Sequence, residues 1–125
     1  MYVLEQPQPT ETPIPGVSHA TWAGRDDGLQ SLSLWRQSIA PGGATPPHSH
    51  SCDEVVMCLS GRGEVLIDGV AHAFGRNQTI VLPAGVPHQI VNSGTEPLES
   101  TAVFAATPVP VTLPDGNALE LPWRS

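Results

Sequence analysis

The stretch PGGATPPHSHSCDEVVMCLSG, residues 41–61, carries most of the information about the fold and chemistry of this chain. Its recognisable spacing is Gly42-x5-His48-x-His50-x3-Glu54-x6-Gly61. In an extended segment, residues two apart lie on one face, so His48 and His50 can reach one ion together. A short turn then leads to Glu54, which can add a carboxylate to the two imidazoles. The stretch therefore predicts part of a metal site at the start of a strand.

A second segment supplies the missing imidazole. Its spacing is Pro83-x-Gly85-x2-His88-x3-Asn92, and it follows another predicted strand. Three imidazoles and one carboxylate form a ligand set that first-row divalent metals favour, between thiolate sites and all-oxygen sites. The sequence thus predicts a metal site made of His48, His50, Glu54 and His88, provided that a barrel brings the two segments together.

These two segments resemble the paired motifs of the cupin superfamily. The first matches the family pattern at every fixed position, and the second matches at Pro83, Gly85, His88 and Asn92. The leading glycine of the second motif is replaced by Asn77, a residue type that tolerates the left-handed backbone region. The resemblance covers roughly residues 41–92. It implies an all-β fold, a small double-stranded β-helix (jelly-roll barrel), with the three histidines and Glu54 binding metal inside it. Asn92 is expected to hold a turn or a strand end.

The remaining sequence agrees with an all-β domain. Short runs of β-formers alternate with turn residues, as is typical of a sandwich or barrel. The strands are expected at residues 29–40, 54–59, 64–67, 70–74, 79–82, 86–91 and 101–106. Asp68-Gly69 predicts a two-residue hairpin turn. We expect no helix of useful length.

Proline marks both ends of the chain. Residues 1–19 are expected to form an extended arm, residues 20–107 the barrel, and residues 108–125 a Pro-rich tail. The arm could be disordered, pack on the barrel, or pack on a neighbouring chain. Small open jelly rolls often hide their strand edges by dimerising, so we expect a homodimer. The two Pro-rich termini could serve as its straps or pack on their own barrel.

Composition limits the class of protein and its partners. The chain has 125 residues with 39% hydrophobic content, which indicates one domain. No apolar run approaches the ~18 residues of a membrane span. The first residues contain neither a basic start nor an apolar run, so we expect a cytoplasmic protein. A net charge of −7, with five arginines as its basic residues, argues against nucleic-acid and anionic-membrane partners.

Two cysteines, Cys52 and Cys58, are expected to remain unpaired. They lie along one extended segment, which separates them too far for a disulfide. This spacing fits a reducing compartment, and Cys58 is expected to act as a small buried hydrophobe.

Strand alternation suggests which residues line a substrate pocket. Val56 and Cys58 share the Glu54 face, and Ile90 shares the His88 face, so these three are candidate substrate-binding residues.

Arg36 is a fourth candidate, because it is an even number of residues from Leu32 and Leu34 and could therefore point into the barrel on the same strand face. A buried arginine there would clamp a carboxylate-bearing substrate. The alternative is an arginine at the strand end that bends into solvent. His19 and His72 lie outside both motifs and are expected to be structural or surface residues.

The ligand set permits several functions. Four ligands leave two positions of an octahedral ion for water, substrate or O₂, which suits Fe(II), our favoured metal, or Mn, Ni or Co; tetrahedral Zn would be filled and less reactive. We favour an enzyme, a metal-dependent dioxygenase-like oxidoreductase acting on a small organic molecule. The second possibility is a non-redox isomerase, lyase or hydrolase that uses the ion as a Lewis acid. The third is a non-catalytic small-molecule-binding or sensing domain, because one fold supports many functions.

Overall fold

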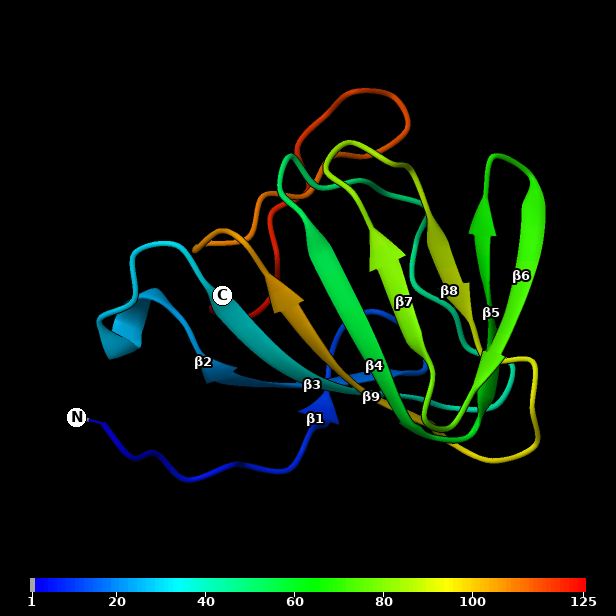
Figure 1. Ribbon diagram of the computed structural model, residues 1–125, viewed down its shortest axis with the longest axis horizontal. Helices are drawn as coiled ribbons and strands as arrows, with labels where there is room; N and C mark the ends of the chain where they lie inside the picture. The colour runs from blue at the N-terminus through cyan, green and yellow to red at the C-terminus, as the bar shows by residue number, and fades with distance from the viewer. Residues whose placement is uncertain (1) are drawn as a thin grey trace.

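The computed structural model describes residues 2–125 and consists of two antiparallel sheets that enclose one core (Figure 1). The larger sheet has the order β1-β2-β3-β9-β4-β7, and the smaller one has the order β6-β5-β8. The strands of the larger sheet are β1 (Thr10–Glu11), β2 (Val17–Ala23), β3 (Ser33–Ile39), β9 (Leu98–Phe104), β4 (Glu54–Ser60) and β7 (Thr79–Leu82). The smaller sheet holds β5 (Arg62–Ile67), β6 (Val70–Gly75) and β8 (Gln89–Val91). A single 3₁₀ turn, η1 (Arg25–Asp27), follows β2.

The predicted all-β double-stranded β-helix is confirmed. Its defining feature is β9, which comes last in the chain yet lies in the middle of the larger sheet. It pairs with β3 on one side, where Phe104 lies opposite Ser33, and with β4 on the other, where Phe104 lies opposite Glu54. Strands that are distant in sequence are thereby joined around one core.

Strict alternation determines which side chains enter that core. In β4, Glu54, Val56 and Cys58 are buried while the residues between them are partly exposed. Phe104, Leu82 and Leu98 are the largest fully buried side chains, with exposed fractions of 1–2%. Both sheets contribute to the same apolar cluster, so the barrel interior is packed rather than open.

Two tight turns have the predicted chemistry. Asp68 (φ 52°) and Gly69 (φ 75°) both adopt the left-handed region, as a type I′ hairpin between β5 and β6 requires. Asn77 also adopts positive φ (69°), so it can replace the glycine of the second motif.

The strand expected at residues 29–40 begins later and faces the other way. β3 starts at Ser33, and its buried positions include Ser33, Trp35 and Ile39. Leu32 is 47% exposed and lies outside the strand. The prediction that the even-numbered residues face inward was wrong, because burying Trp35 and Ile39 removes more apolar surface from water than burying Leu32 and Leu34.

The barrel is longer than residues 20–107. β2 begins at Val17, inside the expected N-terminal arm, and Val17 is 3% exposed. Val109 and Val111, inside the expected tail, belong to the buried core at 5% exposed each. Residues 2–9 run away from the barrel as an extended segment (Figure 1). The Trp22 indole donates to the Pro7 carbonyl oxygen at 2.9 Å, and this bond holds the segment to β2.

Both cysteines are buried and unpaired, as expected. Burial raises the pKa of the Cys52 and Cys58 thiols. Within residues 2–125, no helix has the length and apolar character needed to span a bilayer.

Candidate metal centre

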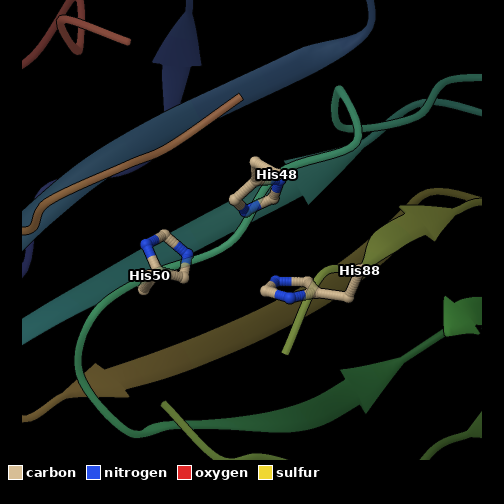
Figure 2. A group of neighbouring side chains, drawn as sticks. All are labelled: His48, His50 and His88. Carbon is tan, nitrogen blue, oxygen red and sulfur yellow. The ribbon is translucent and has the colours of Figure 1, made fainter. Parts of the chain in front are cut away.

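A pair of backbone hydrogen bonds brings the two motifs together. The His48 amide donates to the His88 carbonyl at 3.0 Å, and the His88 amide donates to the His48 carbonyl at 2.8 Å. The Gly85 amide donates to the His50 carbonyl at 2.7 Å. Figure 2 shows the result: the rings of His48 and His50, from one continuous segment, face the ring of His88 from the other. Their nitrogen ligand atoms lie within 4.8 Å of one another, so the three histidines could hold a metal ion.

Backbone carbonyls fix the tautomer of each ring. Nδ1 of His48 contacts the Pro46 oxygen at 2.6 Å, Nδ1 of His50 the Pro110 oxygen at 2.8 Å, and Nδ1 of His88 the Val86 oxygen at 2.9 Å. A carbonyl oxygen only accepts, so each Nδ1 must carry the hydrogen and donate it. In the neutral rings, each Nε2 then presents a lone pair to the interior, as metal-binding histidines do.

Glu54 faces the same point. Its Oε1 lies 3.3 Å from Nε2 of His50 and 3.3 Å from Nε2 of His88. These contacts lack hydrogen-bond alignment, and both Glu54 Oε1 and His88 Nε2 are buried without a partner. Buried polar atoms without a partner are costly, and the convergence of these two fits a bound cation.

The protonation of the site follows from these contacts. Burial alone would raise the pKa of the Glu54 carboxyl, but the contacts with His50 and His88 outweigh burial and lower that pKa to about 2. Burial, followed by repulsion from His88, lowers the pKa of His48 to about 4. For His88, burial favours the neutral ring, but the Glu54 carboxylate outweighs it and raises the pKa. Glu54 is therefore ionised and His48 neutral at neutral pH.

A narrow cavity of about 50 Å³ adjoins the histidines. Besides the three histidines and Glu54, its polar lining residues are Gln37 and Thr45. The other lining residues are apolar: Ile14, Val17, Trp35, Pro46, Ile90, Phe104, Val111, Leu119, Leu121 and Trp123. Such a volume has room for a few water molecules, since one water needs roughly 10–15 Å³ measured in the same way.

The cavity includes only one of the four predicted substrate-binding residues. Ile90 lines it beside the histidines, as expected. Val56 and Cys58 share the buried face of Glu54, but they lie in the packed core and do not border the cavity.

Arg36 does not point into the barrel, so that prediction was wrong. It lies on the outer face of the larger sheet, where its Nη2 forms an ion pair with the Glu99 carboxylate at 3.1 Å. Its Nη1 donates to the Gln37 carbonyl at 2.7 Å. The one-residue shift in the inward face of β3 accounts for this, because Trp35 and Gln37 take the interior positions instead.

Three other polar residues have the expected structural positions. Asn92 is 2% exposed, and its amide donates to the Ile39 and Glu96 carbonyls at 2.8 Å each. His72 is exposed on β6. His19 is buried between two tryptophans, stacked on Trp123 with ring centroids 4.1 Å apart.

Sequence reasoning missed the C-terminal wall of the cavity. Leu119, Leu121 and Trp123 line it, and the residues between them are exposed. This alternation is the period-two signal of an extended segment with one buried face, but the prolines around it suggested a mere tail.

Known proteins resemble both the sequence and the fold. The profile of the family described as "Cupin domain" matches residues 35–104. Auxin-binding protein 1 of Arabidopsis thaliana is 35% identical over 107 residues, which cover 78% of this chain and 54% of that protein. Auxin-binding protein 4 of Zea mays is 32% identical over 111 residues, which cover 80% of this chain and 54% of that protein. The chain thus spans about half the length of these relatives.

Solved structures give the same result. The polyketide cyclase RemF from Streptomyces resistomycificus superimposes with a TM-score of 0.70 at 23% identity, covering 86% of this chain and 84% of that one. An oxalate oxidase superimposes with a TM-score of 0.67 at 26% identity, and the match covers 76% of this chain and 53% of that one. With the family profile matching more than half of its length, the chain belongs to the cupin family.

Proposed function

We propose that this protein binds one divalent transition metal through His48, His50, His88 and Glu54, and that the metal holds a small organic carboxylate. The proposal depends most on one observation: three Nε2 atoms and an ionised carboxylate converge in a buried site where neither Glu54 Oε1 nor His88 Nε2 has a hydrogen-bond partner. Fe(II) is our favoured metal, and Mn, Co, Ni or Zn are alternatives, since imidazole and carboxylate suit all of these ions.

Charge favours an anionic ligand. Three neutral imidazoles and one carboxylate would leave a divalent ion with a net positive charge in a mostly apolar cavity. Oxalate oxidase supports the choice of a carboxylate, because oxalate and its substrate analogue glycolate are small carboxylates and that structure is 26% identical to this chain.

Oxygenation is the reaction that this cavity favours. A divalent metal would supply Lewis acidity and, as iron, redox chemistry with O₂. Beyond the three histidines and Glu54, the lining contains no titratable side chain; its other polar members are Gln37 and Thr45. An isomerase, lyase or hydrolase usually needs a separate acid or base near the substrate. The chain's own contribution would be to orient the histidines, exclude water and enclose the ligand in apolar walls.

Non-catalytic binding is the second candidate, and the relatives favour it. The auxin-binding proteins, at 32–35% identity, are named for binding and not for a reaction. The same site would then retain the carboxylate unchanged.

A two-step experiment separates these possibilities. First, the metal-free protein is titrated with Co(II), whose visible absorption reports its ligands, and then with acetate. We expect one Co(II) per chain and a spectral change on addition of acetate; a spectrum unaffected by acetate would contradict carboxylate binding. Second, the Fe(II) form is incubated with a panel of small carboxylates while O₂ is recorded. Substrate-dependent O₂ consumption supports the oxygenase, and ligand binding without O₂ consumption supports the binding protein.

A further inference from the structure

The C-terminal segment, residues 119–125, lies across the metal cavity like an extra strand. Leu119, Leu121 and Trp123 face the cavity, whereas Glu120 and Pro122 are exposed. The ring of Trp123 stacks on His19 with a centroid distance of 4.1 Å and meets the edge of Trp35 at 5.4 Å. One face of the segment therefore fills the barrel and the other faces solvent.

The segment occupies space that an organic ligand would need. With it in place, the cavity measures about 50 Å³, whereas pockets for drug-sized ligands measure roughly 300–1,000 Å³. A two-carbon carboxylate is compact, but a ligand carrying an aromatic ring requires more room. The Trp123 indole is the largest group that could vacate this space.

The segment is attached at its two ends and free between them. At the start, the Leu119 amide donates to the Val111 carbonyl at 2.9 Å. At the finish, the Arg124 side chain donates to the Asp27 carboxylate at 3.1 Å and to the Thr21 carbonyl at 3.3 Å, while its carbonyl accepts from the Thr21 hydroxyl. Ser125 is also bound, through its carbonyl to the Thr107 hydroxyl at 3.0 Å and through its hydroxyl to the Val109 amide at 2.8 Å. Within residues 2–125, no hydrogen bond joins the backbone of residues 120–123 to the barrel. Segments with so few backbone bonds open locally at low cost.

Two indole N–H groups in this wall of the cavity lack hydrogen-bond acceptors. The indole nitrogens of Trp35 and Trp123 are both buried without a hydrogen-bond partner. Trp35 is 4% exposed and sits in the core. Removing Trp123 would uncover the edge of the Trp35 ring. The Trp35 indole N–H could then donate to an acceptor on the ligand, and buried donors normally have such a partner.

We propose that Trp123 sets the size of ligand that reaches the metal, with the C-terminal segment acting as a displaceable plug. Compact anions bind with the plug in place. A ligand with a ring binds only when Trp123 leaves, and its ring then occupies the space between His19 and Trp35. This inference rests on the proposed function, because it assumes that an anion binds at the metal.

Acetate and phenylacetate test the plug, because they share a carboxylate and differ in the ring. Both are titrated into the Co(II) form of the full chain, followed by visible absorption. We compare the native chain with Trp123→Gly, which empties the space, and Arg124→Ala, which keeps Trp123 but removes the two side-chain hydrogen bonds beside it. Glu120→Ala is the matched control, since Glu120 lies on the exposed face of the same segment.

Acetate should bind the native chain and the Glu120→Ala control with affinities within about twofold of each other, and it should still bind Trp123→Gly and Arg124→Ala. Phenylacetate should bind Trp123→Gly at least tenfold more tightly than the native chain or the control, and it should associate faster with Arg124→Ala. Thermal unfolding of each variant checks that the barrel is intact; if Trp123→Gly fails to fold, the association rate of Arg124→Ala decides.

Equal binding and association of phenylacetate across all four proteins, with acetate still binding, would overturn the plug while leaving carboxylate binding in place. If neither acid perturbs the Co(II) spectrum of any protein, both the plug and the proposed function are wrong.

Discussion

The two ends of β4 show how one strand serves two purposes. At one end, Glu54 faces three histidines and a small cavity. At the other end, beyond Cys58, the side chains pack so tightly that only glycine fits at position 63. A Cβ there would lie 2.8 Å from the Phe74 ring and 2.9 Å from the Leu98 side chain. The closed end maximises contact, whereas the histidine end leaves polar atoms unpaired. The difference indicates that stability is concentrated at one end of the barrel and binding chemistry at the other.

Substitution of Leu98 by alanine should give the largest effect on stability. Leu98 is 2% exposed and packs at the closed end, so removing its side chain should cost about 2–5 kcal/mol in the free energy of unfolding. Urea titration measures the change, and the number of metal ions bound per folded chain should stay the same. Val81→Ala is the control, because Val81 is 67% exposed. Equal losses in the two variants would contradict a stability-determining closed end.

Substitution of His50 by alanine should weaken metal binding rather than lower the stability of the fold. Metal affinity should fall by more than about 100-fold, since even residues that merely orient metal ligands often contribute 10–100-fold. Equilibrium dialysis with Co(II) measures the affinity, and His72→Ala serves as the exposed control. If His50→Ala bound metal as tightly as the control, the separation between the two ends would fail.

Acid should lower the free energy of unfolding through His19, which is buried behind the metal-site histidines. Burial, followed by repulsion from Arg124, lowers the pKa of His19 to about 3 from 6.5. The unfolded chain therefore takes up a proton at higher pH than the folded chain. Stability from this residue is complete above pH 6.5 and declines as the pH falls towards 3, with a slope of up to about 1.4 kcal/mol per pH unit.

Urea titrations of the metal-free protein between pH 7 and 4 test this slope. His19→Gln should show a shallower loss of stability than the native chain, whereas His72→Gln should match the native chain. Identical slopes for all three proteins would show that His19 does not contribute to the loss of stability in acid.

Arg36 should give the smallest effect. Its pair with Glu99 is partly exposed, with side-chain exposures of 15% and 25%, so Arg36→Ala should change the free energy of unfolding by less than about 1 kcal/mol. It should leave acetate binding by the Co(II) form unchanged, because the residue lies outside the cavity. A weaker acetate affinity would restore an interior role for this arginine.

The sequence predicted the parts of the molecule that depend on local chemistry. The spacing of His48 and His50, the Asp68-Gly69 turn and the position of Asn77 all follow from strand periodicity and φ preferences. The convergence of His88 with the first motif required the fold that the cupin resemblance implied.

Other features depend on competition between distant contacts. The inward face of β3 is decided by the packing of Trp35 against Phe104, with ring centroids 4.3 Å apart, and no local pattern reveals that partner. The position of Trp123 likewise depends on the cavity that it fills. Its alternation with Leu119 and Leu121 was visible, but the element it packs against was not.

The proposed function requires that His48, His50 and His88 bind one metal ion inside the barrel. Anomalous scattering from crystals of Co(II)-loaded protein, collected on both sides of the cobalt absorption edge, locates that ion. We expect one peak per chain, next to the three Nε2 atoms and Glu54 Oε1. A fully loaded crystal with its peak elsewhere, or with no peak near these side chains, would show that the three histidines do not form the metal site.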